Sequence, residues 1–370
     1  MDEKYLAEII AANTKLREEG PMVGSITNTV SANFVANAQL ACGAKAAMVY
    51  LPDEAASLCK LAKGAYLNLG TLLPVYEKTV PAMLASCKEA GTPWVLDPVG
   101  IGIGELRAEL LAQIKNVPPA VVKGNASEII ALAAAWGLKV RKLKASETAV
   151  DSKGDGACEK AGTSEVSKGA NSAAYSESEL SAISDLAETS EFATKTAASS
   201  ASKDADSAGC ANSTALANAT SSELAAPDLL STKSSNSTPE NTSIVESIDS
   251  VADAKGAAVA IAKFTKGVVV ITGKIDAIVS EQAIIDIPGG SELQTKITGC
   301  GCALGGVIAA YCAVCDPFVA GLSASVHFKL AANLAANRSG APGTFYAEFI
   351  DALYYFDSEN LFNGRFDSLI

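Results

Sequence analysis

Two copies of one structural pattern follow each other in residues 92–137, TPWVLDPVGIGIGELRAELLAQIKNVPPAVVKGNASEIIALAAAWG. In each copy a short apolar run ends in polar and glycine residues, and a longer run with helical spacing of its apolar residues comes next. The apolar runs at 92–100 and 119–125 predict β-strands, whereas the runs at 105–115 and 126–137 predict α-helices. A strand, a helix and a second strand in this order favour a crossover unit, in which the two strands are parallel.

The same alternation continues on both sides of this region. Further helices are predicted at 4–20, 54–64, 80–91 and 251–267, and further strands at 44–51, 65–71 and 268–280, the last with a turn into a second strand. We therefore predict an α/β fold with a mainly parallel central sheet and helices on both faces. Because ligands bind at the carboxyl ends of the strands in such folds, the loops after the strands are the place to look for a functional site.

The composition of residues 143–244 differs sharply from that of the rest of the chain. Ser, Ala, Thr and small acidic residues dominate there, and aromatic and branched aliphatic residues are scarce. Such a segment buries too little apolar surface to offset the entropy lost on ordering it. We predict that 143–244 is a low-complexity, disordered insertion with at most short Ala-rich helical pieces, and that 1–142 and 245–370 together form one domain.

The overall composition restricts the partners and the location of the protein. The chain of 370 residues is 49% hydrophobic and 19% charged, which suffices for a sizeable core. Its formal net charge of -12 argues against nucleic acid and anionic membranes as partners. The first residues lack the pattern of a secretory signal, and polar residues interrupt the long apolar runs. Together with nine cysteines, an odd number, these features predict a cytoplasmic protein with reduced thiols.

Polar residues follow three of the predicted strands, and each cluster has two interpretations. Asp97 in VLDPVG can hold magnesium near phosphates or cap the next helix. In VVKGNASEII, Asn125 and Glu128 fit a capping box, whereas Lys123 can reach a nucleotide phosphate. Thr272 in VITGKIDAIV fits a hairpin turn and can equally contact phosphate. The residue types alone leave both interpretations open.

Residues 296–314, KITGCGCALGGVIAAYCAV, place glycines and cysteines directly before an apolar helical run. Free N–H groups at a helix start, with Gly299 and Gly301 letting the backbone fold around a ligand, predict an anion hole. The alternative is a metal site built from the local cysteines, Cys300, Cys302, Cys312 and Cys315. A helix rising 1.5 Å per residue would hold the two cysteine pairs roughly 15 Å apart, so we favour the anion hole.

A set of motifs occurs in order along the chain: ITNTVSANFVANAQLACGAKAAMV, LNLGT, VLDPVGIG, VVKGNASEI, VITGKIDAI, TKITGCGCALGGVIAAYCAV and APGTF. In this order and context the chain resembles the hydroxyethylthiazole kinase family over nearly all of its length outside 143–244. The resemblance implies a ribokinase-like fold and transfer of the ATP γ-phosphate to the hydroxyl of 4-methyl-5-(2-hydroxyethyl)thiazole, in thiamine biosynthesis or salvage. It also implies a requirement for Mg²⁺ and a homotrimer with active sites at the subunit interfaces.

The resemblance implies roles for individual residues as well. Met48 in AAMVY, Asn28 in ITNTV and Gly299 match substrate-binding positions. Lys123 and Thr272 match positions of the ATP site. Many members of the family have Arg where this chain has Lys123, and a lysine cannot make the two-pronged phosphate contact of an arginine.

The resemblance places the metal and the catalytic group in the remaining motifs. Asp97 and Glu128 match acidic positions near magnesium, which they would hold directly or through water. Cys302 falls where the wider superfamily carries an aspartate as general base, and Gly299 and Gly301 belong to the same anion loop. A free thiol has a pKa of about 8.5, and a helix start is expected to lower it.

Two other functions fit parts of this pattern. One is another enzyme of the same fold, such as a kinase for a different vitamin precursor or sugar, or nicotinamide-nucleotide-hydrate dehydratase, against which the ITN and AAM segments argue. The other is a non-catalytic scaffold, against which the retained Asp97, Glu128 and Thr272 argue. The only histidine, His327, lies in an apolar helical run and is predicted to be packed rather than catalytic.

Overall fold

The computed structural model describes residues 3–141 and 250–356, so the predicted insertion at 143–244 lies outside the described residues. The strands are β1 (Met22–Ile26), β2 (Lys45–Met48), β3 (Gly64–Asn68), β4 (Trp94–Asp97), β5 (Val121–Asn125), β6 (Val268–Thr272), β7 (Asp276–Val279) and β8 (Ile284–Ile287). The helices are α1 (Glu3–Glu19), α2 (Ala32–Ala41), α3 (Pro52–Leu61), α4 (Tyr76–Ala90), α5 (Glu105–Ile114), α6 (Ala126–Ala135), α8 (Val251–Thr265), α9 (Cys300–Cys312), α10 (Pro317–Arg338) and α11 (Pro342–Tyr355). A 3₁₀ helix, η3 (Glu292–Lys296), precedes α9.

The strands form one sheet in the order β2-β1-β3-β4-β5-β6-β7-β8. All neighbouring pairs from β2 to β6 are parallel, and β7 and β8 are added antiparallel at one edge. The predicted turn within 268–280 is confirmed, because β6 and β7 form a hairpin. The carboxyl ends of β1, β3, β4, β5 and β6 therefore lie along one edge of the sheet.

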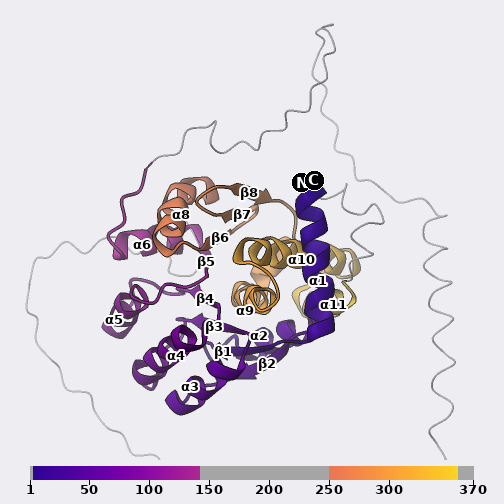
Figure 1. The fold of residues 1–370 in the computed structure, drawn as a ribbon. Coiled ribbons are helices and arrows are strands. Elements are labelled where there is room, and N and C mark those ends of the chain that lie inside the picture. Colours follow the sequence, from indigo (N-terminus) through magenta and orange to yellow (C-terminus); the bar gives the residue numbers. More distant parts are fainter. Residues whose placement is uncertain (1–2, 142–249, 357–370) are drawn as a thin grey trace, which may run out of the picture. The chain divides into compact units, whose positions relative to one another are not determined.

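Helices cover both faces of this sheet (Figure 1). One apolar core lies between the sheet and α3, α4, α5, α6 and α8, and a second core lies between the sheet and α1, α2, α9, α10 and α11. Successive strand residues face opposite cores, as the period of a strand requires: Val121 faces the second core and Val122 the first. The predicted fold class, a mainly parallel sheet with helices on both faces, is confirmed.

Helix α9 packs closely on the sheet because its sequence is rich in small residues. A Cβ atom at Gly305 would lie 2.5 Å from Cε2 of the buried Tyr66 in β3, so only glycine permits this approach. The close packing brings the start of α9 to the carboxyl end of the sheet, where β3 and β4 end.

Two elements near the N-terminus, β1 and α2, are not predicted by the spacing of apolar residues in the sequence. The sequence predicts no strand at β1, because Gly24 and Ser25 interrupt its apolar residues, yet all but the first of its five residues are buried. The sequence likewise predicts no helix at α2, whose residues Phe34, Val35 and Ala38 fill the core beside α9. Both segments are ordered by neighbours that are distant in sequence.

Helix α10 is the one described helix that is long and apolar enough to cross a membrane. In its most apolar window, 83% of the residues are buried inside the protein. A core helix of this composition passes the same test by length and hydropathy alone.

His327 of α10 is fully buried in a chain of hydrogen bonds, as the sequence predicts for a packed histidine. Its Nδ1 lies 2.9 Å from the hydroxyl of Tyr311, which accepts a hydrogen bond from the amide of Asn13. Its Nε2 lies 3.0 Å from the carbonyl oxygen of Leu353, so the neutral ring donates from Nε2 and accepts at Nδ1. Burial lowers the pKa of His327 to about 3.

This histidine is expected to make the protein sensitive to mild acid. The unfolded chain binds a proton at His327 near pH 6.5, whereas the folded protein does not until about pH 3, so acid favours the unfolded state. The stabilisation is complete above about pH 6.5, and below it falls by about 1.4 kcal/mol per pH unit. Denaturant unfolding at about pH 7 and about pH 5 measures this loss, which His327→Gln should largely remove. An unchanged pH dependence in His327→Gln would contradict the assignment.

Candidate active site

The carboxyl ends of the central strands bring three polar side chains together. Asn68 ends β3 and pairs in register with Asp97, which ends β4. In β5, Lys123 reaches Asp97, with its Nζ 3.2 Å from Oδ2 and 3.4 Å from Oδ1. Asp97 is fully buried, and the N-cap of α5 is Gly104, so the interpretation of Asp97 as a helix cap is wrong.

Asp97 accepts hydrogen bonds from neutral groups as well as from this cation. Its Oδ2 accepts from the hydroxyl of Tyr66 and from Nδ2 of Asn68, each at 2.9 Å. Burial alone would lower the pKa of Lys123, but the negative charges of Asp97 and Glu128 outweigh it and raise that pKa. Lys123 therefore stays protonated at neutral pH, although the charge of Asp97 is paired with it.

Asn68 connects Asp97 to the start of α9, and it is not among the site residues predicted from the sequence. Its Nδ2 lies 3.2 Å from Sγ of Cys302, and its Oδ1 accepts from Nδ2 of Asn28 (2.8 Å) and from N–H of Gly70 (2.9 Å). The signal available in the sequence is a polar residue at the end of an apolar run, in LNLGT. Its importance appears only when the sheet register places it beside Asp97.

Cys302 lies in the first turn of α9 and is half-buried. Amide groups surround its sulfur, because Asn28 Nδ2 also lies 3.6 Å away. Burial, and then the charge of Asp97, raise the pKa of Cys302, although Lys123 and hydrogen bonds from Ser31 and Asn68 oppose them. The predicted lowering by the helix start is therefore wrong, and the thiol is mainly neutral at neutral pH.

The start of α9 has the backbone features on which the predicted anion hole depends. The helix begins at Cys300, three residues earlier than expected, because Gly299 adopts a left-handed conformation (φ 87°) as its N-cap. The first bond of the helix runs from N–H of Ala303 to the carbonyl of Gly299 (2.8 Å), so the preceding N–H groups have no partner within the helix. A Cβ atom at Gly301 would lie 3.2 Å from Nζ of Lys123, so this cation stands beside the free N–H groups.

The cysteine metal site that was the alternative is not formed. Cys300 and Cys302 begin α9, whereas Cys312 ends it and Cys315 follows it. Nowhere in 3–141 and 250–356 do three or more His, Cys, Asp or Glu side chains gather as metal ligands. The pKa of Cys300 is raised to about 12 by burial, as befits a packed thiol.

Glu128 caps helix α6, and its charge also interacts with those of Asp97 and Lys123. It completes the predicted capping box of α6: its Oε2 accepts from N–H of Asn125 (2.8 Å), and Asn125 Oδ1 accepts from N–H of Glu128 (2.9 Å). Burial, followed by the charge of Asp97, raises the pKa of Glu128, while Lys123 and the Asn125 N–H lower it. The capping interpretation is confirmed. The effects of Asp97 and Lys123 on the pKa of Glu128 show that its carboxylate lies within electrostatic reach of both.

The remaining predicted residues flank this cluster. Asn28 follows β1 and joins the cluster through Asn68. Met48 ends the edge strand β2, which β1 and β3 separate from β4. Thr272 ends β6 and pairs in register with Asn125, so β5 separates it from Asp97. The structure thus places Met48 and Thr272 on opposite sides of the Asp97–Lys123 pair.

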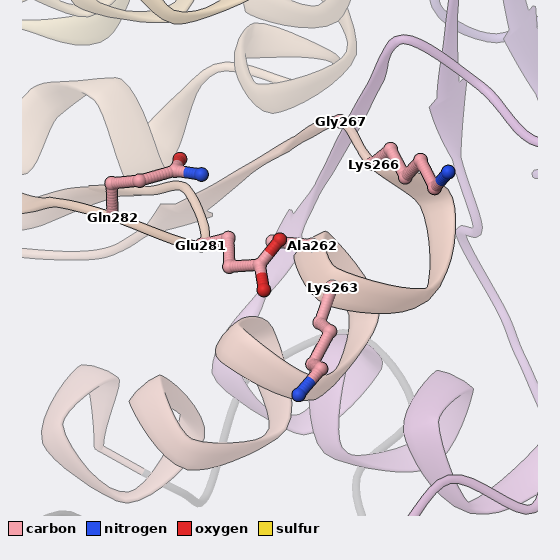
Figure 2. Close-up of a pocket in the computed structure, with 6 residues that line it drawn as sticks. All are labelled: Ala262, Lys263, Lys266, Gly267, Glu281 and Gln282. Carbon is pink, nitrogen blue, oxygen red and sulfur yellow. The ribbon is translucent and has the colours of Figure 1, made fainter.

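A cavity of about 440 Å³ lies elsewhere, between the C-terminal end of α8 and the β7–β8 turn (Figure 2). Its lining includes Gly267, which directly precedes β6, so the cavity lies at the amino ends of the strands. In Figure 2 the side chains of Lys263 and Lys266 extend away from each other, so their charges do not converge on one ligand. This cavity therefore has no part in the candidate active site.

Comparisons with known proteins identify the family of this chain. The family model described as "Hydroxyethylthiazole kinase family" matches residues 14–232 and 225–359. Proteins named hydroxyethylthiazole kinase from Bifidobacterium adolescentis and Bifidobacterium longum subsp. infantis are 34% and 32% identical, covering 94% and 97% of this chain and 90% of each relative. The structure of the hydroxyethylthiazole kinase protein from Pyrococcus horikoshii shares the fold, with a TM-score of 0.61 at 23% identity over 96% of each chain. The chain therefore belongs to the hydroxyethylthiazole kinase family.

Proposed function

We propose that this protein is an ATP-dependent kinase that phosphorylates the primary hydroxyl of 4-methyl-5-(2-hydroxyethyl)thiazole in thiamine biosynthesis or salvage. The observation that carries the proposal is the buried Asp97–Lys123 pair, which stands directly beside the glycine-rich start of α9. Phosphoryl transfer needs positioning and charge neutralisation more than covalent chemistry, and these groups supply both. The names of the relatives support the choice of the thiazole alcohol as substrate.

In this proposal the start of α9 holds the transferring phosphoryl group. The N–H groups of residues 300–302 bind its oxygens, and Gly299 and Gly301 leave room for it. Lys123 offsets its charge, and Thr272 contacts the nucleotide phosphates from the end of β6. Cys302 lies beside the acceptor hydroxyl, and its thiolate form, a minor fraction at neutral pH, takes the hydroxyl proton late in the transfer, when the hydroxyl is most acidic.

The fully buried Asp97 and the partly buried Glu128 suit Mg²⁺ in this proposal. The charge of Asp97 contributes, after burial, to the raised pKa of Glu128, so a cation held near both carboxylates would add to the charge neutralisation that Lys123 supplies. Magnesium prefers carboxylate, phosphate and water oxygens, which fits binding by Asp97 and Glu128 through water. When bound, the ion would neutralise charge on the phosphates of ATP.

The substrate side suits a homotrimer with active sites at the subunit interfaces. Met48 and Asn28 would bind the thiazole at the β2 edge of the sheet. Three of the exposed large apolar side chains, Val30, Leu40 and Leu51, lie in the segments next to β1 and β2. A neighbouring subunit would cover such residues, and light scattering on the purified protein measures the subunit number. A cytoplasmic location agrees with the free state of the cysteines among the described residues.

The proposal is tested by an ATP-coupled assay of the full chain with the thiazole alcohol and a panel of other alcohols, including vitamin precursors and sugars. The thiazole alcohol should give the highest kcat/KM. A higher kcat/KM for another alcohol would identify a different kinase of the same fold. Binding of ATP without turnover of any alcohol would favour the non-catalytic alternative.

Cys302 is expected to assist catalysis without being essential. Because its pKa is raised, the thiol is largely protonated at neutral pH, and Cys302→Ser should keep measurable activity. Cys302→Asp should be tolerated or faster, since a carboxylate is ionised at neutral pH and Lys123 stands nearby. The rate of the unsubstituted enzyme should rise as pH increases above neutral, and this rise should disappear in Cys302→Asp. Loss of all turnover in both folded variants would instead favour an essential thiol.

A further inference from the structure

A second buried ion pair lies at the β6 side of the sheet, outside the Asp97 cluster. Lys329 of α10 lies with its Nζ 3.2 Å from Oδ1 of Asp276, and the two side chains are 8% and 4% exposed. The same ammonium group donates to the carbonyl oxygens of Gly273 (2.8 Å) and Lys274 (3.3 Å). Its three protons thus meet three oxygens, which offsets the cost of burying the charge.

Both members of this pair hold the turn that follows Thr272. Oδ1 of Asp276 accepts a hydrogen bond from N–H of Gly273 (2.9 Å), while Lys329 binds the carbonyl of the same residue. The peptide groups on both sides of Gly273 are therefore fixed by charged partners. The carbonyl oxygens of residues 273 and 274 would repel phosphate, and Lys329 keeps them engaged within the protein.

The stem of Lys329 also supports the loop that leads to α9. At Gly290 (φ 86°), a Cβ atom would lie 2.9 Å from Cδ of Lys329 and 2.6 Å from Oε1 of Gln294. Nε2 of Gln294 lies 3.7 Å from Sγ of Cys300, the first residue of α9. One buried side chain of α10 thus contacts the turn after β6 and the loop before the anion site.

We propose that Lys329 and Asp276 are positioning residues for the nucleotide: they fix the turn after Thr272 and align it with the start of α9. Neither residue needs to touch ATP for this role. The inference rests on the proposed function in one respect: it assumes that the turn after Thr272 and the start of α9 bind the phosphates of ATP.

The test measures nucleotide binding separately from turnover and from stability. Lys329→Met keeps the length of the side chain and removes its charge, and we expect it to weaken Mg-ADP binding about tenfold or more in calorimetry. The KM for ATP should rise in parallel, while the KM for the thiazole alcohol stays within about twofold. The matched control is Lys255→Met, which removes the pair between α8 and β8 (Lys255 Nζ to Asp286 Oδ2, 2.8 Å). It should lower the melting temperature without changing Mg-ADP affinity.

A double variant separates positioning from mere stability. Lys329→Met leaves a buried carboxylate at Asp276, whereas Asp276→Asn with Lys329→Met does not, so the double variant should melt at a higher temperature than the single one. We expect its Mg-ADP affinity to remain low. Recovery of affinity together with stability, or native affinity in Lys329→Met, would overturn the inference. Unsubstituted protein that binds Mg-ADP without phosphorylating the thiazole alcohol would contradict the proposed function alone.

Discussion

Asp97→Asn is expected to lower kcat for the thiazole alcohol by about 10³-fold. The carboxylate is fully buried and accepts from Tyr66, Asn68 and Lys123 at once, so it fixes the centre of the site. Asparagine keeps the shape but removes the charge that balances Lys123 and, in the proposed mechanism, helps to hold magnesium. Losses of 10²- to 10³-fold are typical when one charge-stabilising group is removed from an active site.

The same substitution should also destabilise the protein, because it leaves the ammonium group of Lys123 buried without its ion partner. Removing one member of a buried ion pair costs about 3–5 kcal/mol. The matched control is Asp286→Asn, which breaks the partly exposed pair with Lys255. It should cost less stability than Asp97→Asn, because the Asp286 side chain is 42% exposed whereas that of Asp97 is fully buried, and it should leave kcat unchanged. Steady-state kinetics and denaturant unfolding measure both effects, and an Asp97→Asn enzyme within tenfold of normal kcat would refute the role of Asp97.

Gly299→Ala is expected to reduce kcat by about 10²-fold, because it would distort the backbone of residues 299–302 at the start of α9. The φ of 87° at this residue is strained for alanine by about 1–2 kcal/mol. The added Cβ would also lie 2.8 Å from Cβ of Ser31, so one of the two segments has to move. Ser31 hydrogen-bonds Cys302, so the movement would disturb both the N–H groups and the thiol. A displacement of about 1 Å in a catalytic group is enough for a loss of this size.

Gly91→Ala offers a control with the same backbone strain and no clash. Gly91 is the C-cap residue of α4 and has a φ of 69°, and a Cβ atom added there would meet no other atom within 4 Å. Both variants should therefore lose stability, but only Gly299→Ala should lose kcat. Melting curves and kinetics at saturating ATP and thiazole alcohol separate the two effects. Equal activity of both variants would show that the conformation of Gly299 is unimportant for the reaction.

The residues that could be identified from the sequence are those whose chemistry is local. Asp97, Lys123 and Glu128 stand out because each is polar at or just after an apolar strand, and the glycines at 299 and 301 stand out because they precede an apolar helix. The capping box of Asn125 and Glu128 depends on residues three apart, so its spacing alone predicts it correctly.

Asn68 and the Asp276–Lys329 pair could not be identified in this way. Asn68 acquires its role from a register with Asp97 and a contact with Cys302, which is 234 residues away. Lys329 reaches its turn across 56 residues and appears in the sequence only as a charge inside an apolar helix. Periodicity describes one segment at a time, so it carries no information on which distant segments meet.

The alternation of strand and helix patterns was enough to predict the α/β class and to select the edge of the sheet that bears the candidate site, because both follow from local periodicity and crossover geometry. The ionisation of the site depended on the tertiary structure. A helix start lowers the pKa of a thiol when it acts alone, but in the folded protein burial and the charge of Asp97 raise the pKa of Cys302. Desolvation and charge proximity arise only when β4, β5 and α9 pack together, and no pattern within a single segment contains them.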